Sequence, residues 1–344
     1  MTAYRVAVVG ATGAVGTTML DILSERGFPS GEVVPFASER SAGRQLGELT
    51  VQALSPDAIE GFDVALFSAG SSVSREWAPR FVQAGAVVVD NSSCWRMEPD
   101  VPLVVAEVNP DALTGHRGIV ANPNCSTTQM VVVLKPLHDA AGIERVVVST
   151  YQSVSGTGAA AVAELQGQAH AILHEMDPGA PEVYAHQIAF NAIPHVETFA
   201  DGDDYSTEER KMMRETRKIL GDDSLPISAT CVRVPVVTSH SESINLQTRA
   251  DLDPARCREL LAAAPGVTVI DEPGSAVYPT AVDATGRDDV LVGRIRRDPS
   301  AERTLNLWVV GDNLRKGAAL NAVQLAELLH ERGLMRAGAA RAAS

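Results

Sequence analysis

Short apolar runs alternate with helix-like stretches over the first third of the chain. The apolar runs cover residues 4–9, 32–37, 64–67, 87–89, 103–105 and 119–121. Residues 17–26 and 72–83 have the spacing of helices, and in the first of these Met19, Leu20, Ile22 and Leu23 are expected to face inward. Near-continuous apolar strands that alternate with helices are typical of a doubly wound parallel sheet. We therefore predict a Rossmann-like domain over residues 1–124.

The pattern changes after residue 124. Strands are expected at 146–154, 228–237 and 243–248, helices at 130–140 and 256–264, and a hairpin joins 291–295 to 305–310. Helices segregated from a mixed or antiparallel sheet indicate an α+β domain. The helix predicted at 316–329 is expected to pack back on the first domain. We therefore assign residues 1–124 and 313–344 to one domain and residues 125–312 to the other.

Composition excludes several classes of protein. The 344 residues include 45% hydrophobic ones, and the formal net charge is -14. A strongly acidic chain argues against a nucleic-acid partner, because such binding needs a basic surface. No apolar run approaches the roughly 18 residues of a membrane span. No signal-peptide pattern opens the chain, so we expect a cytoplasmic protein without membrane contacts.

The four cysteines show neither paired nor metal-like spacing. They stand at positions 94, 125, 231 and 257. In a cytosolic protein they are expected to be reduced thiols rather than disulfides. The sequence thus predicts no metal site.

A glycine-rich turn follows the first predicted strand. It reads Gly10-Ala11-Thr12-Gly13-Ala14-Val15-Gly16. Between a strand and a helix, such a turn lets the backbone approach a phosphate, which the helix N-terminus then binds. We predict nucleotide binding by Gly10, Thr12, Gly13, Ala14 and Val15. The alternative is a glycine-rich turn that binds nothing.

The second strand leads to a loop that selects between the two nicotinamide cofactors. An acidic residue there favours NAD, and an arginine accommodates the extra phosphate of NADP. Both occur, as Glu39 and Arg40. Arg40 between Ser38 and Ser41 offers a guanidinium and hydroxyls that suit a phosphate monoester. We therefore favour NADP, against the alternative of a solvated loop charge.

Cys125 is a candidate nucleophile. It lies in Asn122-Pro123-Asn124-Cys125-Ser126-Thr127, immediately before the helix predicted from Met130. Pro123 disfavours helix at Asn122 and Asn124 is a good N-cap, which places Cys125 in the first helical turn. The helix dipole and unpaired N–H groups there stabilise a thiolate. The alternative, a small buried cysteine, is equally compatible with the local pattern.

Four motifs in the same order resemble the aspartate-semialdehyde dehydrogenase family over nearly the whole chain. They are Gly10-Ala11-Thr12-Gly13-Ala14-Val15-Gly16, Asn122-Pro123-Asn124-Cys125-Ser126-Thr127, Tyr151-Gln152-Ser153-Val154-Ser155-Gly156, and Arg233-Val234-Pro235 followed by Ser239-His240-Ser241-Glu242. Together they are specific, although no single motif would be. The resemblance implies NADP as cofactor and a homodimer or homotetramer.

The resemblance also implies a role for each matching residue. Cys125 is the nucleophile, His240 its acid/base partner, and Gln152 orients the reacting carbonyl. Arg233 grips the substrate carboxylate and Glu208 its ammonium. The remaining implied contacts are Arg96 and Lys211 with inorganic phosphate, and Ser155, Gly156 and Asn313 with the cofactor. Taken without the resemblance, Glu208 and Lys211 would be a surface ion pair of little energetic value.

Arg233 and His240 are separated by seven positions. On one regular strand an odd separation would point them to opposite faces. Pro235 and the polar pair Thr238-Ser239 must therefore interrupt the strand if both side chains line one pocket. Without the family motif, His240 would be read as a structural histidine.

The sequence thus favours an NADPH-dependent reductive dephosphorylation of L-4-aspartyl phosphate to L-aspartate 4-semialdehyde and phosphate, through a cysteine thioester. This reaction serves lysine, threonine, methionine and diaminopimelate synthesis. One alternative is N-acetyl-glutamyl-phosphate reductase, whose substrate has no ammonium for Glu208 to bind. Another is a non-catalytic nucleotide-binding regulatory protein.

Overall fold

The computed structural model describes residues 3–335, which form two compact units. Within the described residues, the first unit runs up to Asn124 and resumes at Ala318, and the second is Cys125–Gly317. The return to the first unit therefore lies at Ala318 rather than at Asn313. The reason is local: the Asp312 carboxylate accepts the backbone N–H of Leu314 at 2.8 Å, which holds this turn on the second unit.

The first unit is built on a six-stranded parallel sheet. Its strands are β1 (Tyr4–Val9), β2 (Ser30–Ala37), β5 (Gln52–Ala53), β6 (Val64–Phe67), β7 (Val87–Asp90) and β8 (Ile119–Ala121). Their spatial order is β5-β2-β1-β6-β7-β8. Numbered along the chain within this sheet, that order is 3-2-1-4-5-6, the doubly wound order of dinucleotide-binding folds. The short hairpin β3 (Gln45–Leu46) and β4 (Leu49–Thr50) lies between β2 and β5.

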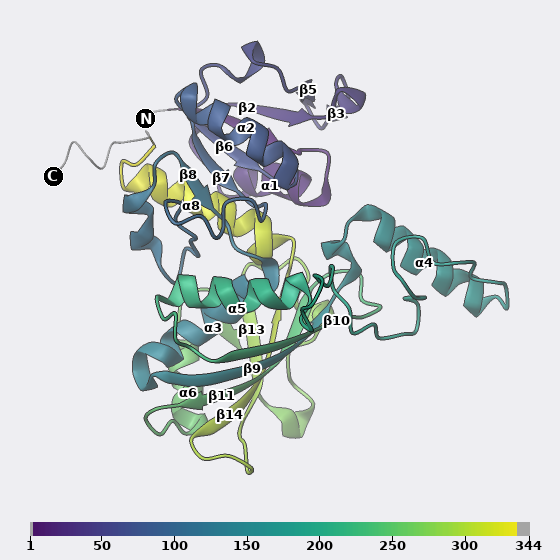
Figure 1. Ribbon diagram of the computed structural model, residues 1–344, viewed down its shortest axis with the longest axis vertical. Helices are drawn as coiled ribbons and strands as arrows, with labels where there is room; N and C mark the ends of the chain where they lie inside the picture. The colour runs from purple at the N-terminus through teal and green to yellow at the C-terminus, as the bar shows by residue number, and fades with distance from the viewer. Residues whose placement is uncertain (1–2, 336–344) are drawn as a thin grey trace. The chain divides into compact units, whose positions relative to one another are not determined.

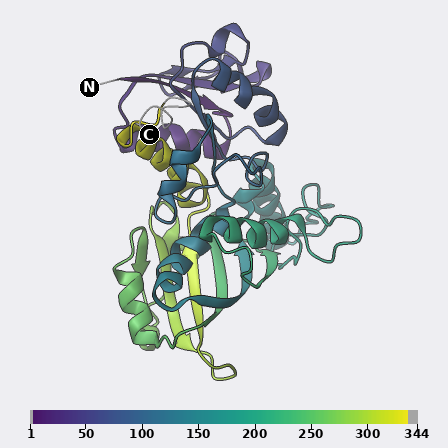
Figure 2. The same ribbon diagram turned by 60° about the vertical axis from the view of Figure 1, so that its left-hand side comes forward.

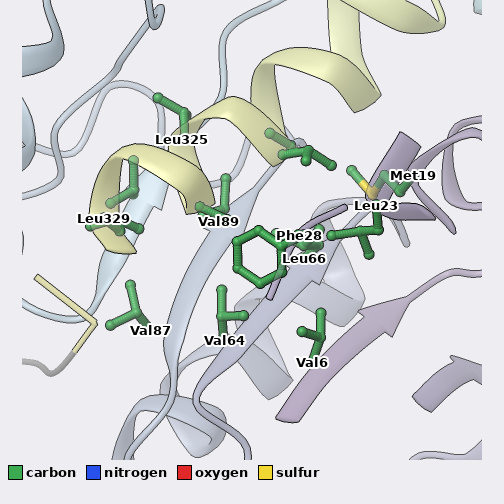
Figure 3. Packing of buried hydrophobic residues seen from close by; sticks show 14 of the residues in the cluster. Val6, Met19, Leu23, Phe28, Val64, Leu66, Val87, Val89, Leu325 and Leu329 are labelled. Carbon is green, nitrogen blue, oxygen red and sulfur yellow. The ribbon is translucent and has the colours of Figure 1, made fainter. Parts of the chain in front are cut away.

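Helices cover both faces of this sheet. On one face, α1 (Ala14–Glu25) and α8 (Leu320–Glu331) share a buried apolar cluster with the strands. Figure 3 shows Leu325 and Leu329 of α8 in the buried cluster that also contains Val87 and Val89. On the other face, α2 (Ser71–Gln83) contributes Phe81 to a second cluster. The predicted return of the last helix to the first domain is therefore confirmed.

One predicted strand is absent from this sheet. Residues 103–105 pair with β8 only through an isolated bridge between Leu103 and Ala121. Val104 donates its N–H to the carbonyl of Ala121, so the segment follows β8 for a single step. Its apolar character reflects burial against the core, which periodicity cannot distinguish from a paired strand.

The second unit is built on a mixed six-stranded sheet. Its strands are β9 (Ile143–Gln152), β10 (Ile227–Arg233), β11 (His240–Thr248), β12 (Val267–Val269), β13 (Val290–Arg297) and β14 (Thr304–Gly311), in the order β10-β9-β11-β14-β13-β12. The two pairs at the edges, β10 with β9 and β13 with β12, are parallel. Between them β9, β11, β14 and β13 each run antiparallel to the next strand in the sheet. The predicted hairpin of β13 with β14 and the α+β architecture are both confirmed.

The helices of the second unit are α3 (Cys125–Ala141), α4 (Ala159–Leu173), α5 (Thr207–Leu220), α6 (Pro254–Ala262) and α7 (Ala281–Ala284). Of these, α3 contacts α5, α6 and the central strands, and these three helices form one layer. Figures 1 and 2 show α5 and α3 beside the strands of this sheet, whereas α4 projects away from it. No helix in the described part of the chain is long and apolar enough to cross a bilayer.

Candidate active site

Cys125 is the first residue of α3 and is the most accessible of the four cysteines. It is partly exposed, and Cys94, Cys231 and Cys257 are buried. Burial raises the pKa of Cys257 to about 12 and also raises the pKa values of Cys94 and Cys231. The described thiols therefore separate into one accessible group at a helix start and three that burial keeps protonated.

Three predicted residues form one row across the second sheet. Arg233 is paired with Gln152 on the adjoining strand. On the other side of β9, Ser241 pairs with Tyr151, which brings His240 beside Gln152. Neighbours in such a row project from the same face of a sheet, and all three side chains are at most 5% exposed. The seven-residue separation is accommodated because Arg233 ends β10 and His240 begins β11.

The imidazole of His240 has a defined tautomer. Its Nδ1 lies 3.0 Å from the backbone N–H of Ser153, which can only donate, so Nδ1 is the acceptor and Nε2 carries the proton of the neutral ring. Nε2 has no hydrogen-bond partner among residues 3–335. Burial, assisted by the charge of Arg233, lowers the pKa of His240 to about 3. His240 is thus a neutral ring with an available Nε2–H donor.

Gly156 leaves room at this donor. A Cβ atom at this position would lie 3.3 Å from Nε2 of His240 and 3.4 Å from Nη1 of Arg233. The guanidinium of Arg233 is itself anchored, because Nη1 donates to the carbonyl of Ser153 at 2.6 Å. Its Nε is buried without a partner in the described residues. A buried, incompletely satisfied guanidinium beside a small open space is suited to binding an anion.

Glu208 and Lys211 reach this row from α5. The start of that helix is fixed by a capping box between Ser206 and Glu209. In the first turn, the amide of Gln152 donates to Glu208 at 3.0 Å. Lys211 lies 3.8 Å from Glu208 and also pairs with Glu197. The carboxylate of Glu208, the amide of Gln152 and the ammonium of Lys211, all singled out from the sequence, therefore lie together.

Asn313 connects the remaining predicted groups. Its Oδ1 accepts the hydroxyl hydrogens of Ser153 and Ser155 and the backbone N–H of Ser239 at 2.8 Å. Because Ser239 precedes His240, Asn313 fixes the start of β11 as well as the turn at Ser155. Ser153 belongs to one of the motifs but was assigned no role from the sequence. Its contact with His240 depends on the pairing of β9 with β11, which the sequence does not specify.

The glycine-rich turn lies at the switch point of the first sheet, where β1 and β6 lie side by side and the strand order reverses. Both first and last glycines of the turn are required by close packing. A Cβ at Gly10 would meet the backbone of Ser68 at 2.8 Å, and one at Gly16 would lie 2.2 Å from the carbonyl oxygen of Gly10. The N-terminus of α1 has no side-chain cap, so its first N–H groups are available to an anion.

A pocket of about 470 Å³ opens at this turn. The residues that line it are Val9, Gly10, Thr12, Gly13, Ala37, Ser38, Glu39, Leu54, Ser68, Ala69, Val73 and Trp77. Of the residues expected to select the cofactor, Ser38 and Glu39 line the pocket, whereas Arg40 and Ser41 lie in the adjoining turn. The position at the switch point, the uncapped helix and the glycines fit the pyrophosphate of a dinucleotide.

Arg96 lies in the first unit. Its Nε donates to the carbonyl of Asn122 at 3.0 Å and its Nη2 to the carbonyl of Asn91 at 2.7 Å. These bonds hold a guanidinium that is only 7% exposed. No group of three or more potential metal ligands occurs in residues 3–335.

Comparison with known proteins agrees with this arrangement. Residues 5–116 match the family model for the semialdehyde dehydrogenase NAD binding domain, and residues 134–316 match that for the semialdehyde dehydrogenase dimerisation domain. The chain is 56% identical over 339 residues to the aspartate-semialdehyde dehydrogenase of Aquifex aeolicus, covering 96% of this chain and 99% of that protein.

Solved structures show the same likeness. A crystal structure of aspartate semialdehyde dehydrogenase II from Vibrio cholerae has a TM-score of 0.93 and 48% identity, over 96% of this chain and 99% of that one. The same enzyme complexed with ASA has a TM-score of 0.92. A Candida albicans aspartate semialdehyde dehydrogenase with NADP has a TM-score of 0.74 and 27% identity, over 97% of this chain and 100% of that one.

Proposed function

Because the chain belongs to the aspartate-semialdehyde dehydrogenase family, we propose that it reduces L-4-aspartyl phosphate to L-aspartate 4-semialdehyde and phosphate, or runs the reverse reaction. The observation that carries this assignment is the buried row of Arg233, Gln152 and His240, with Glu208 hydrogen-bonded to Gln152. Within a few ångströms it combines a carboxylate-binding cation, an ammonium-binding anion and a proton donor. A small substrate with both an α-carboxylate and a free α-amino group matches that set.

The thiolate of Cys125 attacks the acyl carbon of the bound acyl phosphate. A C–S bond forms, the C–O bond to phosphate breaks, and the thioester retains the acyl group. The start of α3 favours the attacking thiolate through the helix dipole. After reduction, collapse of the thiohemiacetal oxyanion breaks the C–S bond and restores the thiolate.

His240 serves the acyl oxygen in this scheme. Its neutral ring presents Nε2–H, which donates a hydrogen bond to the oxygen that becomes negative at each tetrahedral stage. In the reverse direction the same Nε2–H stabilises the thiohemiacetal oxyanion from which the hydride leaves. Gln152 orients the carbonyl. Burial of the whole row excludes the water that would hydrolyse the thioester.

The residues that bind the substrate and phosphate are assigned from their charges. Arg233 binds the α-carboxylate through its planar fork, and Glu208 binds the ammonium. Lys211, on the next turn of α5, binds phosphate together with Arg96. Lys211 is paired with Glu197, so phosphate binding would exchange one anion for another. A free-amino substrate adds a positive charge beside Glu208, whereas an N-acetylated one would add none.

The first unit binds a nicotinamide dinucleotide, which supplies the hydride. We propose that Gly10, Thr12, Gly13, Ala14 and Val15 hold its pyrophosphate. The same proposal assigns the 2′-phosphate of NADP to Ser38, Arg40 and Ser41. Arg40 and Ser41 border the pocket rather than line it, as a group at the outer end of the adenosine would require. Ser155, Gly156 and Asn313 are assigned to the nicotinamide end.

The second unit carries the proposed catalysis and oligomerisation. Its match to a dimerisation domain supports self-association, and we propose a homodimer or homotetramer. A free thiol nucleophile needs a reducing compartment, so the proposal places the reaction in the cytoplasm.

The test is phosphate-dependent reduction of NADP+ by L-aspartate 4-semialdehyde. NAD+ and N-acetyl-glutamate 5-semialdehyde are run alongside, with Cys125→Ser as the inactive control. We expect a rate that needs phosphate, the free-amino aldehyde and Cys125, and that is faster with NADP+. A rate only with the acetylated aldehyde would replace the substrate, and no rate with either would overturn the reductase assignment.

A further inference from the structure

Gln129 lies one turn after Cys125 on α3 and has no part in the reaction described above. Residues four apart share a face of a helix, so Gln129 and Cys125 project from α3 on the same side. Gln129 is 1% exposed. Its Nε2 donates to the backbone carbonyl of His240 at 3.3 Å. One side chain thus links the helix that begins with the proposed nucleophile to the first residue of the strand that carries the imidazole.

Two glycines allow α3 to lie this close. Gly311 is the partner of His240 on β14, and a Cβ there would lie 2.8 Å from Oε1 of Gln129. Gly317 lies one turn closer to the helix start, and a Cβ there would lie 2.8 Å from Cβ of Cys125. Real Cβ atoms do not approach so closely, so a larger residue at Gly311 would displace the Gln129 amide and one at Gly317 would displace the start of the helix. The segment 311–317 is therefore shaped to the face of α3 that bears Cys125 and Gln129.

The layer around Gln129 is otherwise poor in groups that could replace this link. Glu242 lies two residues beyond His240, on the same face of β11, and is fully buried beside the Gln129 amide. Glu208 faces Glu242 from α5. No hydrogen bond joins the Glu242 carboxyl to the His240 carbonyl among residues 3–335. The amide of Gln129 is the donor that this position needs.

We infer that Gln129 is a positioning residue, which fixes the imidazole of His240 relative to the thiol of Cys125 by joining α3 to β11. This inference rests on the proposed function, because it assumes that these two groups react together. Misplacement of reacting groups by about 1 Å costs about 100-fold in rate. Loss of the Gln129 link should consequently lower kcat and leave substrate binding by Arg233 in place.

The test compares Gln129→Met with Gln168→Met. Methionine keeps the volume and removes the donor. Gln168 is a matched control because it is also a buried amide, 3% exposed, whose Oε1 accepts the backbone N–H groups of Ile188 and Ala189. We expect Q129M to lower kcat by about 10- to 100-fold with KM changed by less than about threefold, and Q168M to lower the thermal midpoint without this loss of kcat. An unchanged kcat in Q129M would overturn the inference.

A second readout does not require turnover. The rate of iodoacetamide alkylation of Cys125 is followed against pH in wild type, Q129M and His240→Asn, in which the amide oxygen replaces Nδ1 and no group replaces Nε2–H. We expect H240N to move the alkylation midpoint to higher pH, and Q129M to move it in the same direction. If wild type and H240N had the same pH profile of alkylation, His240 would not be coupled to Cys125, and the proposed function would fail. If the profile of H240N differed from wild type while that of Q129M matched wild type, the role of Gln129 would be overturned.

Gly311→Ala covers the case in which Q129M does not fold. The added Cβ displaces the Gln129 amide from the His240 carbonyl while retaining Gln129 itself. We expect the same fall in kcat and the same shift in alkylation. A G311A protein with wild-type kcat and profile would contradict the inference.

Discussion

At the residue scale, the chemistry depends on the neutral state of His240. Burial and Arg233 lower its pKa to about 3, so the ring stays neutral in the free enzyme throughout the pH range of an ordinary assay. The folded protein favours the neutral imidazole of His240 more strongly than the unfolded chain does. This contribution to stability is full above the unfolded pKa of about 6.5 and is lost as pH falls toward the folded value.

A pH-independent effect of His240→Asn follows. We expect kcat/KM to fall by about 10²- to 10³-fold, the range for loss of a donor to a developing oxyanion. The ratio of wild type to variant should be the same at pH 5.5 and pH 8, because kcat/KM reports the free enzyme and the ring does not titrate between these values. A ratio that shrinks below pH 6.5 would show an ordinary histidine pKa and contradict the buried neutral ring.

The buried carboxyl of Glu242 should change stability with pH in the direction opposite to that of His240. Burial raises the pKa of its carboxyl well above the usual range, the Gln129 amide opposes this, and Glu208 adds to it. A raised folded pKa gives stability that is full below about pH 4.5 and is lost as pH rises through the folded value.

Glu242→Gln, a neutral isostere, should therefore become more stable relative to wild type as pH rises from 5 to 8. The difference in unfolding free energy should grow by up to about 1.4 kcal/mol per pH unit while the wild-type carboxyl remains protonated. Denaturant unfolding at several pH values measures it. The exposed Glu259→Gln serves as the control and should show no such slope; an equally flat difference for E242Q would mean that Glu242 ionises normally.

At the element scale, helices and buried strands were predictable, and their ends and partners were not. The helix α2 and the apolar strands β6 and β7 are local patterns, and they appear where expected. By contrast β10 was expected to continue to residue 237 and ends at Arg233. That end is set by pairing with β9, which also ends there. A local pattern contains no information on such a partner.

The same distinction applies to the candidate site. The motifs were sufficient to predict Cys125, Gln152, Arg233 and His240 as a group. They did not reveal Gln129, because a glutamine in a helix is ordinary until Gly311 of a strand far along the chain lies against it. The helix α4 was also not predicted; its alanine-rich sequence has a weak apolar face, and it projects from the sheet (Figure 1).

The turn before α1 gives a prediction at this scale. Gly16→Ala would set a Cβ 2.2 Å from the carbonyl of Gly10, which must move the turn. We expect cofactor affinity to fall by at least about tenfold, with alkylation of Cys125 unchanged, because the two residues lie in different units. Titration of cofactor binding by fluorescence measures the first effect. Gly27→Ala, at a position of open space but positive φ, controls for general destabilisation; equal losses of affinity in both variants would contradict the role of the turn.

At the scale of the whole molecule, the chain passes between two units that each have their own buried clusters. The first unit is assembled from both ends of the chain, and α8 closes one face of its sheet (Figure 3). The second is continuous. This arrangement predicts that damage to α8 destabilises cofactor binding and leaves the chemistry of the second unit intact.

Leu325→Ala tests this independence. Leu325 is fully buried in the cluster that includes Val87 and Val89, and removing such a side chain costs about 2–5 kcal/mol. Trp77 and Trp95 pack in the first unit and Trp308 in the second, so a Trp308→Phe background reports the first unit alone. The double substitution Trp77→Phe with Trp95→Phe leaves Trp308 to report the second. We expect L325A to lower the denaturant midpoint of the first signal and to move that of Trp308 much less. Equal shifts would mean that the two units unfold as one cooperative body, in which case substitutions in either unit would alter both the binding of cofactor and the reactivity of Cys125.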